Sequence, residues 1–247
     1  MKALIFAAGL GTRLRPLTND RPKALVQVAG KPMLQHVLGR VAAAGFDDIT
    51  INIHHYGQAI IDFLAKNRNF GLNLHISDER DMLLDTGGGI LKARRWLDGD
   101  QPFLVHNTDI ITNLDLRAFY QYHVLHKALA SILVKERVTQ RYFLFDRDDR
   151  LHGWHNKATG EFKPASLNPH AEWRQLAFGG IHIISPEIFE PLQRYKEEEG
   201  AKFSITPFYI SQCRQYLIHG YQPVGDYYWF DIGKHETLAQ AEAVLRQ

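Results

Sequence analysis

Short apolar segments alternate with helix-like segments along the first half of the chain, and this order constrains the fold more than any other feature. The apolar segments are typical of buried strands and lie at residues 2–6, 48–54, 72–76 and 102–106. Helical patterns separate them at residues 32–44, 59–66 and 89–97. This order predicts a largely parallel sheet with helices on both faces, and such sheets bind ligands beyond the carboxyl ends of their strands.

The second half changes to a hairpin pattern from about residue 130. Strand-like segments lie at residues 131–134, 142–145 and 177–184, with turn-rich connections at 146–149 and 157–160. An amphipathic helix is predicted at 235–245, and no linker interrupts the chain. We therefore expect one α/β domain over residues 1–247, in which residues 129–247 complete the sheet of residues 1–128 and add a small β-rich lobe.

Composition excludes several classes of protein. The 29 lysines and arginines nearly balance the 27 aspartates and glutamates, so nothing indicates a surface for nucleic acid or membrane. Cys213 is the only cysteine, which excludes a disulfide framework and favours a reducing compartment. The chain enters a strand at once, without a signal-peptide pattern, and no apolar run could span a bilayer. We expect a cytoplasmic protein whose partners are small molecules.

A glycine-rich loop with two fixed cations follows the first strand. Gly9 and Gly11 allow backbone N–H groups to approach an anion without side chains in the way. Arg13 and Lys23 place positive charges near that loop, and two prolines stiffen the chain that carries them. This combination predicts a cradle for a triphosphate.

The common phosphate-loop patterns do not describe this loop. A dinucleotide fingerprint requires G-x-G-x-x-G opening into a helix, whereas Leu14 stands at the third glycine position and Pro16 disfavours a continuous helix. The P-loop pattern also fails, because no lysine and hydroxyl pair follows Gly11. A dinucleotide-dependent oxidoreductase is therefore disfavoured.

The loop resembles the signature of the nucleotidyltransferases that join a sugar 1-phosphate to a nucleoside triphosphate. That signature runs approximately A-G-G-x-G-T-R-L-x-P-L-T-x-x-x-P-K-x-L and is followed by K-P-M. The chain matches it at residues 8–18, 22–25 and 31–33, with Ala8 where many members have glycine. The resemblance implies a Rossmann-like, mostly parallel mixed sheet flanked by helices (a GT-A-like fold) with a small β-rich sugar-binding lobe. Residues 1–128 would then be the nucleotide-binding half.

The resemblance also implies a mechanism and a set of site residues. The sugar 1-phosphate would attack the α-phosphorus of the triphosphate in line, and pyrophosphate would leave. Arg13 and Lys23 would be catalytic, and Mg²⁺ would be held by Asp109 and Asp231. Further substrate contacts are implied for Ala8, Gly9, Gly11, Thr12, Gly88, Asn107, Lys163 and Gly180.

Asp109 and Asp231 stand in two further motifs that resemble the family. Asn107-Thr108-Asp109 follows the strand at 102–106 and resembles N-G-D, with threonine in place of glycine. Residues 229–234 resemble W-x-D-I-G-T, with lysine at the last position. Carboxylate oxygens suit Mg²⁺, which one or two carboxylates and substrate phosphates typically hold. From the residues alone, each aspartate could instead cap the segment that follows it, so their convergence on one pocket is a prediction about the fold.

The segment at 84–89 resembles the stretch that packs against the nucleobase in this family. Its three glycines would let a flat base lie on the backbone while amide groups read its edge. The alternative is a flexible loop before a helix that Thr86 caps. A base-reading carboxylate could come from residues 78–79. The base itself stays undetermined.

The sugar side carries weaker resemblances. The glycine pair in 179–181 resembles the pair that lines the sugar, and residues 161–164 resemble an E-K-P turn with Phe162 at the glutamate position. Lys163 is therefore expected to contact the sugar, and Glu161 is a further candidate.

Substrate identity stays open between several members of the family. The short chain, the 84–90 loop and the 178–182 segment look most like small uridylyltransferases that act on N-acetylmuramic acid 1-phosphate, which favours UTP. Guanylyltransferases for mannose or heptose 1-phosphate look nearly as similar, and cytidylyltransferases for phosphocholine share the opening motif. A non-catalytic nucleotide-sensing relative is the alternative from another class, although a sensor has little need for both carboxylates.

Overall fold

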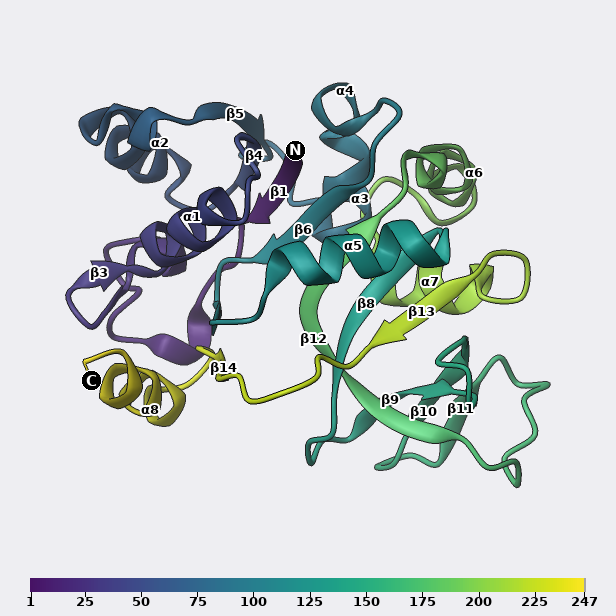
Figure 1. Ribbon diagram of the computed structural model, residues 1–247. Coiled ribbons are helices and arrows are strands. Elements are labelled where there is room, and N and C mark those ends of the chain that lie inside the picture. Colours follow the sequence, from purple (N-terminus) through teal and green to yellow (C-terminus); the bar gives the residue numbers. More distant parts are fainter. Residues whose placement is uncertain (247) are drawn as a thin grey trace.

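One mixed sheet of ten strands runs through residues 1–246, the part of the chain that the computed structural model describes (Figure 1). Its main path is β11-β10-β9-β12-β6-β1-β4-β5, and β8 pairs with both β12 and β13. The strands are β1 (Lys2–Phe6), β4 (Asp48–Ile53), β5 (Asn73–Asp78), β6 (Phe103–Asn107), β8 (Ala130–Lys135), β9 (Arg141–Phe145), β10 (Leu151–Asn156), β11 (Glu161–Lys163), β12 (Arg174–Ile184) and β13 (Ile218–Tyr221). Two small pairings are separate from it: β2 (Gln27–Val28) with β3 (Lys31–Pro32), and β7 (Ile110–Thr112) with β14 (Trp229–Asp231).

Two hydrophobic clusters place the helices in two layers. One cluster packs α1, α2, α5 and α8 against the face of β1 that carries Ala3 and Ile5, whereas the other packs α3, α4, α6 and α7 against the face that carries Leu4. The two faces alternate because successive side chains of a strand point to opposite sides. The helices are α1 (Met33–Ala43), α2 (Gly57–Lys66), α3 (Asp85–Lys92), α4 (Arg94–Leu97), α5 (Leu116–His126), α6 (Phe189–Glu199), α7 (Ile205–Gln212) and α8 (His235–Leu245). The predicted α/β fold with helices on both faces is confirmed.

The strands β6, β1, β4 and β5 are parallel to one another, as the alternating pattern predicts. Their carboxyl ends therefore meet at one edge of the sheet. The residues that stand there are Phe6, Ile53, Asp78 and Asn107. This edge receives the glycine-rich loop from β1 and the Asn107-Thr108-Asp109 motif from β6.

The long strand β12 joins the parallel half to a small lobe. Its second half runs antiparallel to β6 and β8, and its first half pairs with β9, which continues into β10 and β11. The register against β8 shifts between Phe178 and His182, where Gly180 has a φ of 75°. A side chain at Gly180 would be strained, and its Cβ would lie 3.1 Å from the Nδ2 of Asn107. The predicted β-rich lobe is thus a continuation of the main sheet.

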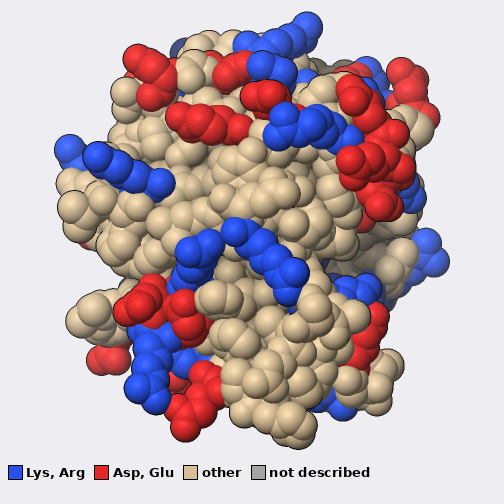
Figure 2. Space-filling model, turned by 90° about the vertical axis from the view of Figure 1, so that its right-hand side faces the viewer, with Lys and Arg blue, Asp and Glu red and all other residues tan. Residues whose placement is uncertain are grey.

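Helix length and surface charge bear on the possible partners. In residues 1–246 no helix is long and apolar enough to cross a membrane. Figure 2 shows acidic and basic side chains interspersed over the face in view. That face therefore presents no broad area of positive charge of the kind that binds nucleic acid.

Candidate active site

Two side chains from other segments fix the glycine-rich loop. β1 ends at Phe6, and the next amide, of Ala7, donates to the side-chain and backbone oxygens of Asn52 at 2.9 and 3.2 Å. Further along, the Thr18 hydroxyl donates to the Gly11 carbonyl at 2.9 Å. Gly11 has a φ of 66°, and a Cβ there would lie 2.9 Å from the Thr18 methyl carbon, so the turn requires glycine.

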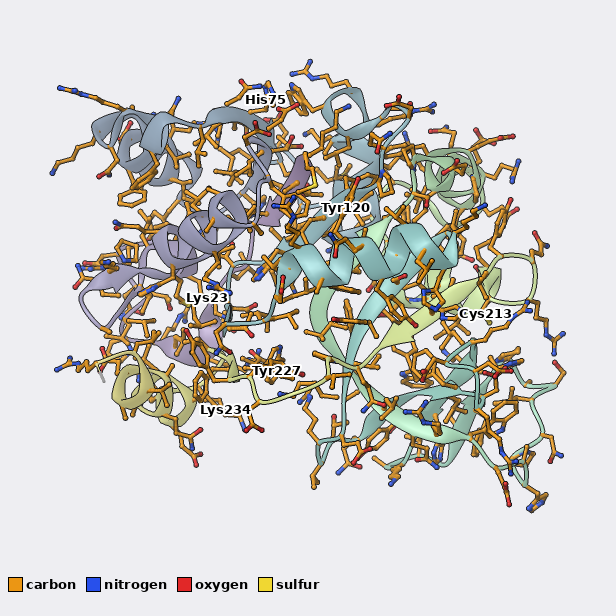
Figure 3. All side chains as sticks on the ribbon, in the orientation of Figure 1. Lys23, His75, Tyr120, Cys213, Tyr227 and Lys234 are labelled. Atoms are coloured by element: carbon orange, nitrogen blue, oxygen red, sulfur yellow. The ribbon has the colours of Figure 1, made fainter. Side chains whose placement is uncertain are left out.

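Lys23 faces Asp109 beside this loop. The Lys23 Nζ lies 2.5 Å from the Asp109 Oδ2, and both side chains are largely buried. Thr108, which replaces a glycine of the motif, is 4% exposed, and its hydroxyl donates to the Phe6 carbonyl. This bond ties the end of β6 to the end of β1, and Asp109 does not cap a helix, because strand β7 follows it directly. In Figure 3, Lys23 lies close to the segment that carries β14.

The pairing of β7 with β14 brings Asp231 to Asp109. Asp109 directly precedes β7, and Asp231 at the end of β14 lies opposite Ile110. The Ile232 amide then donates to the Asp109 carbonyl at 2.8 Å. Asp231 does not cap α8, because Lys234 occupies the N-cap position. Two aspartates far apart in the sequence therefore meet beside the glycine-rich loop.

Nearby charges act in opposite directions on the pKa of Asp231. Burial, and next the negative charge of Asp109, raise the pKa of Asp231. Three cations act in the opposite direction: Lys23, Arg13 and Arg137. The Arg13 guanidinium lies against Gly233, where a Cβ would be only 3.0 Å from its Nη2. Gly233 thus leaves the space that this cation occupies beside the carboxylates.

The two aspartates are the candidate metal ligands. Among the described residues 1–246, no group of three His, Cys, Asp or Glu side chains is arranged to hold a metal ion. A pair of carboxylates nevertheless suits Mg²⁺, which completes its coordination with water and substrate phosphates. Burial, and after it the negative charge of Asp109, raises the pKa of Asp231. A divalent cation bound between the two carboxylates would relieve the repulsion between them, so these two ligands suit the ion.

A cavity of about 390 Å³ opens next to the carboxylates. It brings together the predicted residues Ala8, Gly9, Lys23, Asn107 and Asp109. Its opposite wall comes from Leu83, Asp85, Thr86 and Lys202. Gly11 and Thr12 belong to the adjacent turn and do not line this cavity. The arrangement suits a nucleotide whose phosphates lie toward the loop and whose base lies toward α3.

Glu79 supports this cavity from inside the protein. It is fully buried, its Oε1 accepts from the Asn52 amide group at 2.9 Å, and its Oε2 accepts from the Leu84 amide at 3.0 Å. Asp78 instead pairs with Arg80 at 2.6 Å. Each Glu79 oxygen therefore already accepts one protein hydrogen bond, and Glu79 also lines the cavity, so the base-reading role suggested for residues 78–79 stays a prediction. Glu79 and Asn52 connect the phosphate loop to the start of α3.

The glycines at 87–89 lie inside a helix that begins four residues earlier than the predicted start at residue 89. α3 begins at Asp85, ahead of all three glycines. The first two glycine amides donate to the Phe203 carbonyl at 2.9 and 3.2 Å. A Cβ on Gly88 would lie 2.4 Å from the Ala201 carbonyl oxygen. These amides are thus engaged with protein and do not read the edge of a base, and Gly88 allows close packing of α3 on the 201–203 segment.

The residues predicted for the sugar side lie apart from the first cavity. Lys163 lines a second cavity, of about 740 Å³. The Lys163 Nζ lies 3.3 Å from the Glu161 Oε1, so Glu161 pairs with this lysine and does not line the cavity. Gly180 lies at the bulge of β12, and the neighbouring Gly179 carbonyl accepts from the Trp229 indole at 2.9 Å. That bond joins β12 to the strand that carries Asp231.

The sequence analysis did not identify two parts of the site. One is the buried Asn52–Glu79 pair. Asn52 is a polar residue within the otherwise largely apolar strand β4, and this exception in the pattern could have revealed it. The other is the second cavity beyond Lys163, which contains Arg137 and Arg141. Its residues come from the β8–β9 connection and from β9, β10, β11, β12 and α7, so no local motif could reveal it.

Comparison with known proteins agrees with this geometry. A family model described as Nucleotidyl transferase matches residues 2–247. The chain is 35% identical to the N-acetylmuramate alpha-1-phosphate uridylyltransferase of Neisseria meningitidis serogroup B, over 99% of this chain and 98% of that protein. It is 29% identical to the mannose-1-phosphate guanyltransferase of Schizosaccharomyces pombe, over 95% of this chain and 61% of that protein.

The fold is also shared with solved structures. A Bacillus anthracis protein assigned as a glucose-1-phosphate thymidylyltransferase aligns with a TM-score of 0.83 at 20% identity, covering 100% of this chain and 96% of that one. Both the sequence match and the fold extend over the whole chain. The chain therefore belongs to the nucleotidyl transferase family, as a sugar 1-phosphate nucleotidyltransferase.

Proposed function

We propose that this enzyme transfers the uridylyl group of UTP to N-acetylmuramate 1-phosphate and that it uses Mg²⁺. The observation that carries the proposal is the convergence of Arg13, Lys23, Asp109 and Asp231 at one edge of the sheet. The choice of UTP and of this sugar is supported by the Neisseria relative, which matches at 35% identity over nearly its full length. The guanylyl relative matches at 29% and only over 61% of its length.

The reaction needs no covalent intermediate, because the attacking group is already an anion. An oxygen of the sugar 1-phosphate forms a bond to the α-phosphorus of UTP. The bond from that phosphorus to the oxygen bridging to the β-phosphorus breaks, and pyrophosphate leaves. Since two anions must approach each other, positioning and charge neutralisation supply the catalysis.

Each charged residue has a role in that scheme. Arg13 neutralises charge on the α-phosphate and the leaving pyrophosphate, while Lys23 lies between the α-phosphate and the incoming phosphate. Asp109 and Asp231 would hold Mg²⁺, which would supply further neutralisation of the phosphates when bound. The backbone of Gly9, Gly11 and Thr12 cradles the phosphates.

The remaining predicted residues take supporting places. Ala8 and Asn107 line the nucleotide cavity, and Lys163 lines the second cavity, on the sugar side. Gly180 lines neither cavity and is assigned to the sugar side from its place at the bulge of β12. Cys213 is buried and lies on the other side of the view from Lys23 in Figure 3, so it takes no part in the chemistry. As the only cysteine of the chain, it is consistent with a cytoplasmic location.

Pyrophosphate release tests the proposal. The purified protein is incubated with Mg²⁺, each of four nucleoside triphosphates, and a panel of sugar 1-phosphates. We expect release with UTP and N-acetylmuramate 1-phosphate, and no release without added metal. Release with GTP and mannose 1-phosphate instead would assign the guanylyl reaction. Nucleotide binding without release for any pair would contradict an enzymatic role and support a nucleotide sensor.

Gly233→Ala tests the position of Arg13 without touching Arg13 itself. The new methyl group would occupy space 3.0 Å from the Arg13 Nη2 and displace this flexible side chain. Loss of one transition-state donor lowers kcat by ~10²-fold, so Arg13→Ala and Gly233→Ala should both approach that loss. The melting temperature of Gly233→Ala should stay close to that of the native protein, because only the end of an exposed side chain must move. Unchanged turnover in both variants would remove Arg13 from catalysis.

A further inference from the structure

The second cavity has the composition of a sugar-binding site. Its volume is about 740 Å³, compared with about 390 Å³ for the nucleotide cavity. Aromatic side chains and hydroxyl groups share its walls, as in pockets that bind polar ligands with apolar faces. The aromatic residues are Phe143, Trp154 and Phe178, and the hydroxyl residues are Thr139, Ser204, Thr206 and Ser211.

Every charged side chain that lines this cavity is a cation. The three are Arg137, Arg141 and Lys163. Lys163 has a carboxylate partner, because Glu161 lies 3.3 Å away. Within residues 1–246, the guanidinium groups of Arg137 and Arg141 have neither an ion pair nor a hydrogen bond. Two unpaired guanidinium groups beside an aromatic wall suit the recognition of planar anions, which arginine binds with two parallel hydrogen bonds.

The strand register places Arg141 at the edge of the aromatic wall. Trp154 on β10 lies directly opposite Phe143 on β9 and opposite Lys163 on β11. Residues two apart on a strand point to the same face, so Arg141 lies on the Phe143 side at a spacing of about 7 Å along β9. The Lys163 Nζ lies over the Trp154 ring, 5.6 Å from its centre, so a sugar ring against this wall would meet Lys163 above Trp154 and Arg141 at a corner.

Arg137 lies at the other end of the cavity, toward the reacting centre. Its guanidinium is 5.4 Å from the ring centre of Trp229, two residues before Asp231. Its charge is also among those that lower the pKa of Asp231, after burial and Asp109 have raised it. Arg137 is thus in a position to bind the phosphate of the sugar 1-phosphate, whereas Arg141 is in a position to bind a different anionic group of the sugar.

The two cavities adjoin through a pair of hydroxyl groups. Thr86 lines the nucleotide cavity and Ser204 lines the second cavity. Their hydroxyl oxygens are 3.4 Å apart, and the Ile205 amide donates to the Thr86 oxygen at 2.9 Å. A ligand in the second cavity would accordingly lie next to a nucleotide in the first.

We propose that the second cavity selects a sugar 1-phosphate that carries a carboxylate besides its phosphate, and that Arg141 binds this carboxylate while Arg137 binds the 1-phosphate. The inference rests on the proposed function, because it deepens the choice of acceptor. N-acetylmuramate 1-phosphate has the required chemistry: it is N-acetylglucosamine 1-phosphate with a lactyl ether, and the lactyl group ends in a carboxylate. Arg141 is therefore a specificity-determining residue.

The matched pair of sugars gives a direct test. Dissociation constants for N-acetylmuramate 1-phosphate and N-acetylglucosamine 1-phosphate are measured by calorimetry, with and without a non-hydrolysable UTP analogue. kcat/KM is measured for the same two sugars. We expect the native protein to favour the carboxylate-bearing sugar by roughly 10- to 100-fold in kcat/KM, because only that sugar forms a charge-assisted bond with the exposed Arg141. The binding measurement does not require turnover, so it decides the inference even if the proposed reaction fails.

Two variants in the same cavity separate the two anionic groups. Arg141→Gln should weaken binding of the carboxylate-bearing sugar by roughly 10- to 100-fold and leave the neutral sugar within about threefold, the size of one lost charge-assisted bond. Arg137→Gln should weaken both sugars alike. Arg147→Gln is the control, since Arg147 lies in the same lobe, outside the cavity lining, and pairs with the exposed Glu172 at 2.6 Å. It should change neither sugar.

Two results would overturn the inference. One is equal binding of the two sugars by the native protein. The other is an Arg141→Gln variant that loses both sugars to the same extent, which would make Arg141 a second phosphate contact. Partial rescue of the carboxylate preference by Arg141→Lys would support an interaction between the positive charge at residue 141 and the carboxylate. A lysine keeps that charge but cannot form the two parallel hydrogen bonds of arginine.

Discussion

Replacing Asp109 with asparagine should lower kcat by about 10³-fold while the protein stays folded. The substitution keeps the shape of the side chain but removes the carboxylate that lies 2.5 Å from the Lys23 Nζ and beside Asp231. Metal-stabilised charge in a transition state is worth several kcal/mol, which corresponds to a loss of this size. Stability should change little, because the attraction to Lys23 and the repulsion from Asp231 are lost together.

The measurement combines steady-state kinetics, with both substrates present, and a metal-binding measurement. Mn²⁺ binding in the presence of a non-hydrolysable nucleotide, followed by electron paramagnetic resonance, should weaken in Asp109→Asn, and circular dichroism should show a native fold. Asp148→Asn is a matched control, because Asp148 is an exposed carboxylate on the turn between β9 and β10. If Asp109→Asn kept kcat within about threefold of the native value, the candidate metal site would be wrong.

The parts of the site that follow a strand could be predicted from the sequence. The loop after β1 and the motif after β6 are both local, and parallel strands bring their carboxyl ends to the same edge. The meeting of Asp109 with Asp231 had weaker support, because it depends on the pairing of two strands of only three residues each, β7 and β14. Only the family resemblance indicated that contact, because the hydrophobic periodicity along the chain showed no sign of it.

The parts that depend on tertiary packing could not be predicted in this way. The glycines at 87–89 are typical of a loop, yet they lie within α3, where residue 88 must be glycine because any Cβ there would strike the Ala201 carbonyl. Residue 201 is remote in the sequence, so local propensity favoured the wrong start for the helix. The second cavity could not be predicted from the sequence either, because its walls come together only after β12 has paired with β9.

Acid should destabilise this protein well before its carboxylates titrate. Burial lowers the pKa of His106 and of His123 to about 4, and that of His182 to about 3, from an ordinary value of 6.5. The unfolded chain therefore binds protons near pH 6.5 while the folded protein does not. Unfolding takes up protons, so its free energy falls as the pH decreases. Each histidine contributes about 1.4 kcal/mol per pH unit below 6.5, and the three should remove about 4 kcal/mol by pH 5.5.

His123 provides the control for this effect. Its Nε2 is 2.9 Å from the Ser185 hydroxyl, which itself donates to the Ala128 carbonyl, so the ring must be the donor at that nitrogen. The other nitrogen, 2.9 Å from the Ser131 hydroxyl, then accepts, and both partners are satisfied by the neutral ring.

Urea unfolding between pH 8 and pH 5 measures the slope. For the native protein, the free energy of unfolding should not change with pH above about pH 7.5. At lower pH it should decrease, with a slope that approaches the uptake of three protons on unfolding. His123→Gln keeps a donor and an acceptor but cannot titrate, so its slope should be smaller by about one proton. A stability that is level from pH 7.5 to pH 5.5 would mean that these histidines are protonated in the folded state, and that the buried environment around β6 and β12 differs from the one described.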